Sequence, residues 1–188
     1  MVITILAEPR SGSTNLANWF LLKNEFTVLF EPITNLKLKW YKNNIPPSEW
    51  QYTTNHLLVK EIGHTYFDFS ELINISDKVI ILYRENYKEQ LDSFKNASLT
   101  NDWHKQWVYD KKKIDKRADI DDGFLLFKNH IKNSYLNKNF FKISYEELYY
   151  NNGFQKIVDY LELECVKNEN FPVGEKYRIN IDKPKSLI

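Results

Sequence analysis

Residues 2–14 read VITILAEPRSGST, and this stretch decides the fold. Val2–Ala7 is a continuous apolar and β-branched run, which is typical of a strand buried on both faces of a parallel sheet. A polar turn containing Pro9 and Gly12 ends the run, and apolar residues then recur at helical spacing over residues 16–20. The pattern therefore predicts a strand, a tight loop and a helix, which together form the repeating unit of parallel α/β folds.

Further apolar runs of strand length follow along the chain. Each is short and rich in apolar residues, so each predicts a buried strand. Because helical stretches separate these runs, the sheet is expected to be mainly parallel. The runs are Thr27–Phe30, Leu57–Val59, Val79–Tyr83 and Phe140–Ile143.

Helix starts are visible between the strands. Asn86 with Glu89 three residues later resembles a capping box, and Ser144 with Glu147 repeats the pattern. We predict a three-layer α/β/α sandwich around a mainly parallel sheet, in a single domain over residues 1–188. Other helical patterns cover residues 154–161 and 101–137, the latter with Trp103, Trp107, Phe124, Phe127 and Ile131 as expected buried positions.

Composition and charge narrow the class of protein. A chain of 188 residues fits one domain, and 26 Lys plus Arg against 25 Asp plus Glu give a net charge of +1. This balance argues against nucleic acid or an anionic membrane as a partner. The single cysteine, Cys165, allows no internal disulfide, and no apolar stretch approaches the roughly 18 to 20 residues that span a bilayer. We expect a cytoplasmic protein, complete from Met1, with no signal peptide or anchor.

The loop after the first strand has the chemistry of an anion site. Small residues let consecutive backbone N–H groups converge, and the following helix adds unpaired amides and the positive end of its dipole. Arg10, one of only four arginines in the chain, offers a fork of donors suited to phosphate or sulfate. Ser11, Ser13 and Thr14 add hydroxyl groups. The alternative interpretation is an ordinary turn in which Ser and Gly serve only local capping.

The loop differs from the nucleotide-binding pattern G-x-x-x-x-G-K-[ST], because it holds one glycine and no lysine before Thr14. The strand Val79–Tyr83 is followed by Arg84, where a nucleoside-triphosphate enzyme would place a magnesium-binding Asp. A magnesium-dependent kinase or ATPase is therefore disfavoured. A nucleotide or small-molecule kinase with an unusual phosphate loop stays the rival enzyme class.

A second anion site is expected around Arg84 and Ser93. At about 100° per residue, one continuous helix would put these two side chains on opposite sides. They converge only if Arg84 precedes the helix that Asn86 caps, with Ser93 two turns inside it. A surface arginine beside a solvated helix serine is the alternative interpretation of this spacing.

Taken together, these residues resemble the sulfotransferase family, which uses 3′-phosphoadenosine 5′-phosphosulfate (PAPS). Residues 10–14 look like the family's 5′-phosphosulfate loop, in the R-S-G-S-[ST] form of carbohydrate and bacterial sulfotransferases. Arg84 with Ser93 looks like its 3′-phosphate motif. Residues 30–32 are similar to the F-E-P of the carbohydrate branch, and residues 145–148 to a Y-E-x-L that follows a late strand.

The resemblance covers about residues 2–163 and implies a P-loop NTPase-like sulfotransferase fold. It implies transfer of a sulfuryl group, without a metal, from PAPS to a hydroxyl or amine of a carbohydrate or small-molecule acceptor. The catalytic residues would be Arg10, which stabilises the leaving phosphate, and Glu31, which accepts the acceptor's proton. The cofactor-binding residues would be Arg10, Ser11, Gly12, Ser13 and Thr14 for the phosphosulfate, and Arg84 and Ser93 for the 3′-phosphate.

Several alternatives stay open at this stage. His104 is a second candidate base, and a non-catalytic nucleotide-binding relative would carry the same motifs. The aromatic residues Trp40, Tyr41 and Trp50 suit either an acceptor-binding loop or the core. Near the C-terminus, Arg178, Lys183 and Lys185 either close over the 3′-phosphate or form a frayed tail.

Overall fold

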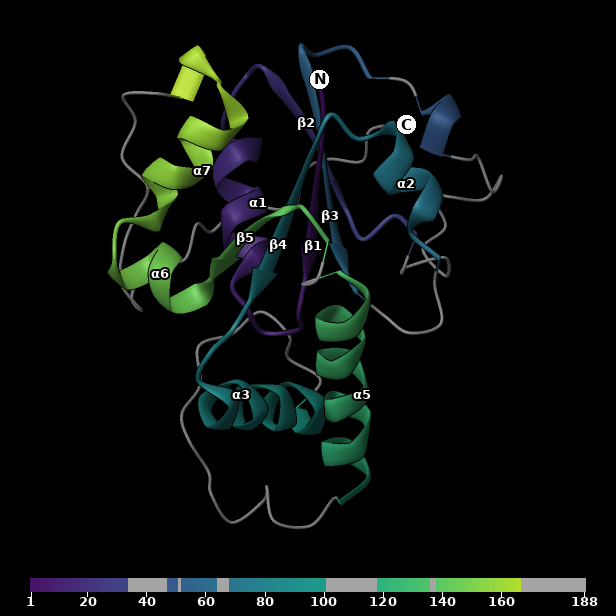
Figure 1. The fold of residues 1–188 in the computed structure, drawn as a ribbon, viewed down its shortest axis with the longest axis vertical. Coiled ribbons are helices and arrows are strands. Elements are labelled where there is room, and N and C mark those ends of the chain that lie inside the picture. Colours follow the sequence, from purple (N-terminus) through teal and green to yellow (C-terminus); the bar gives the residue numbers. More distant parts are fainter. Residues whose placement is uncertain (34–46, 51, 64–67, 101–117, 136–137, 167–188) are drawn as a thin grey trace.

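The structure is a computed structural model, and it describes residues 1–33, 47–50, 52–63, 68–100, 118–135 and 138–166 (Figure 1). For residues 98–100, 118–123, 126, 127 and 165 it describes the backbone alone. The structural statements below refer to these residues.

Five strands form one sheet in which every neighbouring pair is parallel. The order across the sheet is β2-β3-β1-β4-β5. Because all strands run the same way, their carboxyl ends meet at one edge. The strands are β1 (Val2–Ala7), β2 (Phe26–Phe30), β3 (His56–Ile62), β4 (Lys78–Tyr83) and β5 (Phe141–Ser144).

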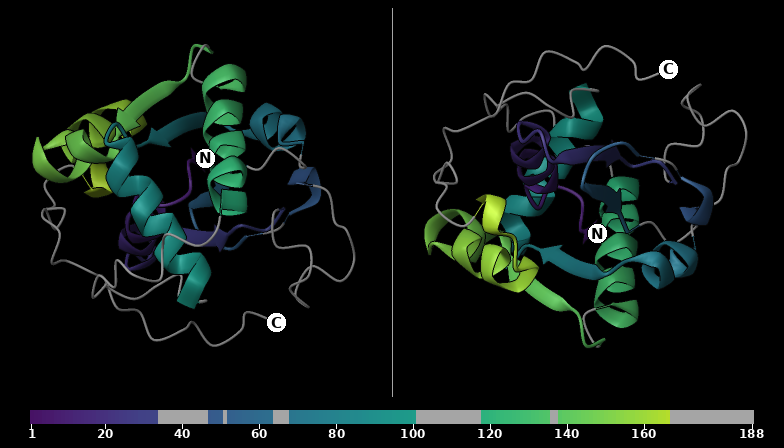
Figure 2. Two further views of the ribbon diagram at one scale, coloured as in Figure 1. Left: turned by 90° about the horizontal axis from the view of Figure 1, so that it is seen from below. Right: turned by 90° about the horizontal axis from the view of Figure 1, so that it is seen from above.

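Helices cover both faces of the sheet (Figures 1 and 2). Strand side chains alternate between faces, so Ile3 and Ile5 of β1 join one core cluster and Leu6 joins the other. The first cluster packs under α1 (Ser13–Leu21), α6 (Tyr145–Tyr150) and α7 (Gly153–Leu161). The second packs under α2 (Ser70–Ile75) and the end of α5 (Ala118–Ser134). The three-layer α/β/α prediction is confirmed.

The remaining elements are α3 (Tyr87–Thr100) and two short 3-10 helices, η2 (Pro47–Glu49) and η3 (Glu164–Val166). Figure 1 shows α3 lying crosswise beyond the carboxyl edge of the sheet, beside α5. Aromatic rings join the two helices, since Phe94 of α3 lies 5.1 Å from Phe124 of α5, centroid to centroid. This pair of helices covers the edge at which the strands end.

All five predicted strands are present, with small differences in length. The largest difference is β3, which continues to Ile62 although the apolar run ends at Val59. The extra residues Lys60 and Glu61 are charged but buried. A search for apolar runs therefore ends the strand before them. The short helix α2 was not predicted. Phe124 and Ile131 are buried as predicted, whereas Trp103 and Trp107 lie outside the described residues.

The two predicted helix caps have different outcomes. The Ser144 hydroxyl accepts the N–H of Glu147 at 3.1 Å, as expected. The Asn86 side chain accepts the N–H of Glu89 at 3.2 Å, which caps α3. A capping box would also have the Glu89 carboxylate accept the N–H of Asn86, and this part of the prediction is wrong. The N–H of Asn86 donates to Glu146 instead, and the Glu89 carboxylate binds Arg84. A buried arginine nearby is a stronger partner for Glu89 than a backbone amide.

The carboxyl ends of β1 and β4 form the topological switch point of the sheet, which we call the crevice. The chain leaves β1 towards β2 through α1, and leaves β4 in the opposite direction towards β5. Ligands of open parallel sheets bind where two neighbouring strands diverge in this way. The loops over residues 8–12 and 84–86 flank this point, so the two predicted anion motifs come together there.

Candidate functional site

The loop between β1 and α1 is a tight turn with two residues in the left-handed backbone region. Arg10 has φ 63° and Gly12 has φ 80°. The Gly12 carbonyl accepts the N–H groups of Asn15 (3.0 Å) and Leu16 (3.2 Å), which starts α1 directly after the loop. The first amides of this helix therefore face the end of the sheet, as an anion site requires.

Helix α6 fixes the shape of this loop. The Tyr149 hydroxyl donates to the Gly12 carbonyl at 2.9 Å and accepts from the Asn15 side chain at 3.3 Å. Burial raises the pKa of Tyr149 well above its ordinary value, so the hydroxyl stays protonated and keeps donating at neutral pH. The rings of Tyr145 and Tyr149 fill the space where a side chain at Gly12 would lie.

The serines of the loop have different roles. The Ser11 hydroxyl is buried and donates to the Glu8 carbonyl at 2.7 Å, which closes the turn. Ser13 is also buried and is the first residue of α1, with Thr14 following it. Ser11 thus offers a ligand its backbone rather than its hydroxyl.

The two arginines meet at the crevice, where each contacts residues of the chain itself. The Nε of Arg10 donates to the Ser93 hydroxyl at 2.9 Å, so Ser93 contacts the loop arginine. One terminal nitrogen of Arg84 lies 3.4 Å from the Arg10 carbonyl and links the two loops. The other donates to the Glu89 carboxylate at 2.7 Å.

The guanidinium of Arg84 is almost fully enclosed. Its carbon lies 4.3 Å from the centroid of the Tyr145 ring, and its Nε lies 3.7 Å from a carboxylate oxygen of Glu146. This Nε is buried and lacks a hydrogen-bond partner in the described part of the chain. Buried donors are normally paired. The unpaired Nε of Arg84 therefore indicates a place for a hydrogen-bond acceptor that the described residues do not supply.

Glu146, the acidic residue of the Y-E-x-L stretch, holds the loop after β4. Its two carboxylate oxygens accept the N–H groups of Glu85 and Asn86, both at 3.0 Å. Burial opposes ionisation of Glu146, but these hydrogen bonds and the charge of Arg84 outweigh it, so its pKa is lowered. Glu146 therefore stays ionised and fixes the backbone next to Arg84.

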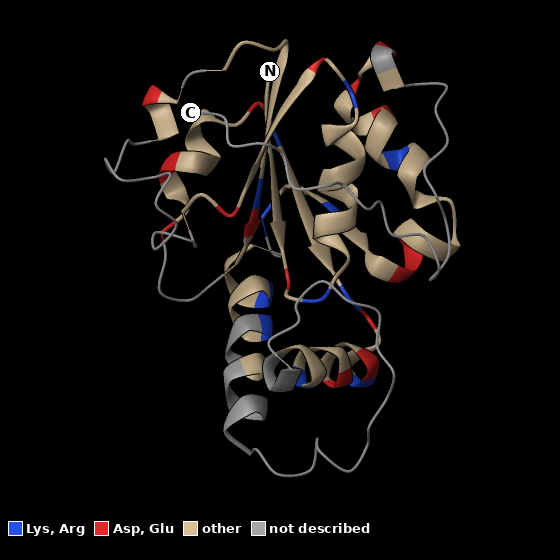
Figure 3. Ribbon diagram, turned by 180° about the vertical axis from the view of Figure 1, so that it is seen from behind, with Lys and Arg blue, Asp and Glu red and all other residues tan. Residues whose placement is uncertain are grey.

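A buried polar network under the loop was not predicted from the sequence. One oxygen of Glu8 accepts from the Arg84 N–H, the Gln90 side chain and the Lys128 ammonium, each at 3.0 Å. Lys128 of α5 also donates to the Arg84 carbonyl at 2.7 Å. Charges of both signs thus lie together in the connections at this edge (Figure 3). The sequence held one indication of this network, because the charged residue Glu8 directly follows a buried strand.

We predict that Lys128→Met destabilises the protein by about 2–3 kcal/mol, because it leaves the Glu8 carboxylate buried without its cation. Lys132 is exposed one turn further along the same helix, so Lys132→Met serves as a matched control with a change within about 0.5 kcal/mol. Chemical unfolding measures both values. Equal stabilities of the two variants would contradict the assigned role of Lys128.

Glu31 lies at the same edge of the sheet, directly after β2. Its φ is 52°, its N–H donates to the Lys60 carbonyl at 2.6 Å, and its carboxylate forms an ion pair with the Lys60 ammonium. The Lys60 side chain is 2% exposed and that of Glu31 is 26% exposed. A buried cation therefore holds this carboxylate in place.

The two residues predicted to be catalytic both have a left-handed backbone conformation. Four described residues other than glycine have positive φ. Asn152 and Glu162 flank α7 as its caps, whereas Arg10 and Glu31 lie in loops at the carboxyl edge. Such conformations cost about 1–3 kcal/mol and cluster at functional sites.

Several residues considered from the sequence lie outside the described residues, namely His104, Trp40, Tyr41, Arg178, Lys183 and Lys185. Trp50 is described, and it packs against the core cluster under α2, in line with the core alternative. Among the described residues, no group of His, Cys, Asp or Glu is suited to hold a metal ion. None of the described helices combines the length and apolar character needed to cross a bilayer.

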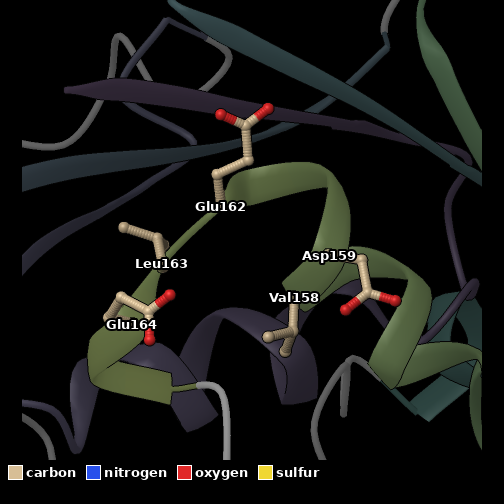
Figure 4. Close-up of a pocket in the computed structure, with 5 residues that line it drawn as sticks. All are labelled: Val158, Asp159, Glu162, Leu163 and Glu164. Carbon is tan, nitrogen blue, oxygen red and sulfur yellow. The ribbon is translucent and has the colours of Figure 1, made fainter.

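One pocket of about 260 Å³ lies away from the crevice, at the end of α7 (Figure 4). Glu162, one of the residues that line the pocket, forms an ion pair with Lys78, the first residue of β4. The pocket therefore lies near the amino edge of the sheet. Three acidic residues among its five lining residues make it unsuited to a phosphate. The lining residues are Val158, Asp159, Glu162, Leu163 and Glu164.

The sheet order and the loop after its first strand define a P-loop-like α/β protein, and the fold is that of the sulfotransferases. The structure is similar to that of mouse sulfotransferase SULT7A1 complexed with PAP, with a TM-score of 0.54 and 16% sequence identity. The similarity covers 90% of this chain and 60% of that one, so the chain spans about three fifths of that enzyme. No protein-family model matches the sequence, and no curated protein is significantly similar to it. The expected fold is confirmed.

Proposed function

We propose that the protein is a cytoplasmic sulfotransferase that transfers a sulfuryl group from PAPS to a hydroxyl or amine of a carbohydrate or other small-molecule acceptor. The observation that carries this proposal is the meeting of two arginines, Arg10 and Arg84, from two strand-end loops at one crevice. Two separate cationic points suit a ligand with phosphate groups at both its 5′ and 3′ positions. The similarity to a sulfotransferase complexed with PAP supports the same assignment.

The residues at the crevice fit such a ligand. The buried Nε of Arg84 lacks an acceptor among the described residues, and the left-handed turn at Gly12 presents backbone amides at the start of α1. Residues 10–14 would hold the 5′-phosphosulfate, and Arg84 with Ser93 would hold the 3′-phosphate. When bound, PAPS supplies the sulfuryl group.

The chain's own residues would supply charge and a base. Arg10 would stabilise negative charge that develops on the 5′-phosphate oxygen, since its fork of donors lies at the loop. Glu31 would accept the proton of the acceptor hydroxyl or amine, because it is partly exposed at the same edge and is oriented by Lys60. A metal has no part in this scheme.

Adenosine 3′,5′-bisphosphate is expected to stabilise the protein more than ADP or ATP does. A ligand present at about 100 times its Kd contributes about 2.7 kcal/mol, which raises the Tm of a chain of this size by roughly 5–11 °C. Thermal unfolding with each nucleotide, with and without magnesium, measures this difference. A larger shift with ATP and magnesium would favour the kinase, and no shift with the bisphosphate would overturn the proposal. Binding without transfer to any acceptor in a broad screen would indicate a non-catalytic relative.

A further inference from the structure

The proposed 3′-phosphate site at Arg84 already contains an anion of the chain itself. The Glu89 carboxylate accepts from a terminal nitrogen of Arg84 at 2.7 Å. Glu89 precedes Ser93 by four residues in α3, so both side chains lie on one face of this helix. That face meets the crevice, because Ser93 binds Arg10 there. Glu89 therefore stands where the 3′-phosphate is proposed to bind.

The two carboxylates at Arg84 differ in how firmly they are held. Glu146 is 23% exposed and is fixed by two backbone amides of the loop after β4. Glu89 is 57% exposed, and its described carboxylate contact is the ion pair with Arg84. Water can solvate the exposed Glu89 carboxylate when it leaves Arg84, and the guanidinium keeps Glu146 beside it, so Glu89 leaves at a smaller cost than Glu146 would.

We infer that Glu89 is an internal competitor, a carboxylate that the 3′-phosphate displaces from Arg84 and that lowers the affinity for this phosphate. This inference rests on the proposed function. A phosphate dianion can bind the guanidinium through two oxygens and so outcompetes a single carboxylate oxygen. A nucleotide without a 3′-phosphate leaves the Arg84–Glu89 pair intact.

The same competition would help the product to leave. Adenosine 3′,5′-bisphosphate keeps its 3′-phosphate after transfer, so tight binding by Arg84 would slow its release. Release of product often limits turnover. A carboxylate next to the site returns to Arg84 and lowers the affinity for the bisphosphate, whereas it has no effect on a 5′-phosphate held by residues 10–14.

The test compares Glu89→Gln with Glu85→Gln, which removes an exposed charge from the loop just before α3. Calorimetry gives the Kd of each variant for adenosine 3′,5′-bisphosphate and for 5′-AMP. We expect Glu89→Gln to tighten bisphosphate binding about two- to fivefold and to leave 5′-AMP unchanged, with both affinities unchanged in Glu85→Gln. Unchanged or weaker bisphosphate binding in Glu89→Gln, or an equal gain in Glu85→Gln, would overturn the inference.

Inorganic phosphate separates this inference from the proposed function. If the wild type does not bind the bisphosphate, the proposed function fails, but Glu89 would still compete with any phosphate at Arg84. Thermal protection by inorganic phosphate that is stronger in Glu89→Gln than in the wild type then supports the inference. Equal protection of the two proteins overturns it.

Discussion

Replacing Glu31 by Gln is expected to lower the rate of sulfuryl transfer by a factor of about 10² to 10⁴, with binding of adenosine 3′,5′-bisphosphate intact. The amide has the shape of the carboxylate but cannot take the acceptor's proton. Transfer is followed as bisphosphate released from PAPS, with the acceptor first identified for the wild type in a panel of hydroxyls and amines. Glu25→Gln, directly before the same strand at the opposite edge of the sheet, is the matched control and should keep full activity.

Loss of folding must be separated from loss of the base in this experiment. Glu31→Gln leaves the buried Lys60 ammonium without its partner, which costs on the order of 1–3 kcal/mol. The double variant Glu31→Gln with Lys60→Met removes both charges and should recover part of that stability while turnover stays low. Full turnover in a folded Glu31→Gln protein would remove Glu31 from the mechanism.

Gly12→Ala is expected to have the largest effect on the loop itself. An added Cβ would lie 2.6 Å from a ring carbon of Tyr149 and 3.0 Å from one of Tyr145, at a φ of 80° that residues with a Cβ rarely adopt. The clash and the backbone strain together predict a loss of about 2–4 kcal/mol in the free energy of unfolding. Because the loop amides would also shift, we expect bisphosphate binding to weaken roughly 10- to 100-fold.

Chemical unfolding and calorimetric titration measure these two effects separately. Tyr149→Phe keeps the ring and removes only the hydroxyl that donates to the Gly12 carbonyl, so it should cost about 1 kcal/mol and weaken binding less. If Gly12→Ala bound the bisphosphate as tightly as the wild type, the loop would not be the phosphate site.

Much of the fold could be read from the chain because its signals are local. The run Val2–Ala7 and the turn at Gly12 predict strand, loop and helix from adjacent residues alone. The prediction stopped short at β3, because Lys60 and Glu61 are charged and yet buried. Their partners Glu31 and Ile33 lie about 30 residues away along the chain and come into contact only through the parallel pairing of β2 with β3.

In the candidate site, too, local sequence features were predictable and contacts between distant residues were not. Arg10 and Arg84 were recognised because each follows a strand, and strand ends can be found by hydrophobic pattern. Their partners could not be assigned from spacing, because a side chain binds whichever group the packing of helices brings near. Thus the sequence grouped Ser93 with Arg84 as ligands of one phosphate, whereas the Ser93 hydroxyl accepts from Arg10 and the Glu89 carboxylate accepts from Arg84 in the structure.

The sequence by itself determined the parallel α/β class, the tight loop after the first strand and the two arginines that follow strands, since these follow from periodicity and from residues that are neighbours in the chain. Only the tertiary structure decided which charges are paired. The network of Glu8, Gln90 and Lys128, the ion pair of Lys60 with Glu31 and the carboxylate of Glu89 on Arg84 all depend on which helix crosses which strand end. The energy of a charge pair in a protein interior depends on the distance between the two groups and on their burial, and the order of residues alone gives neither quantity.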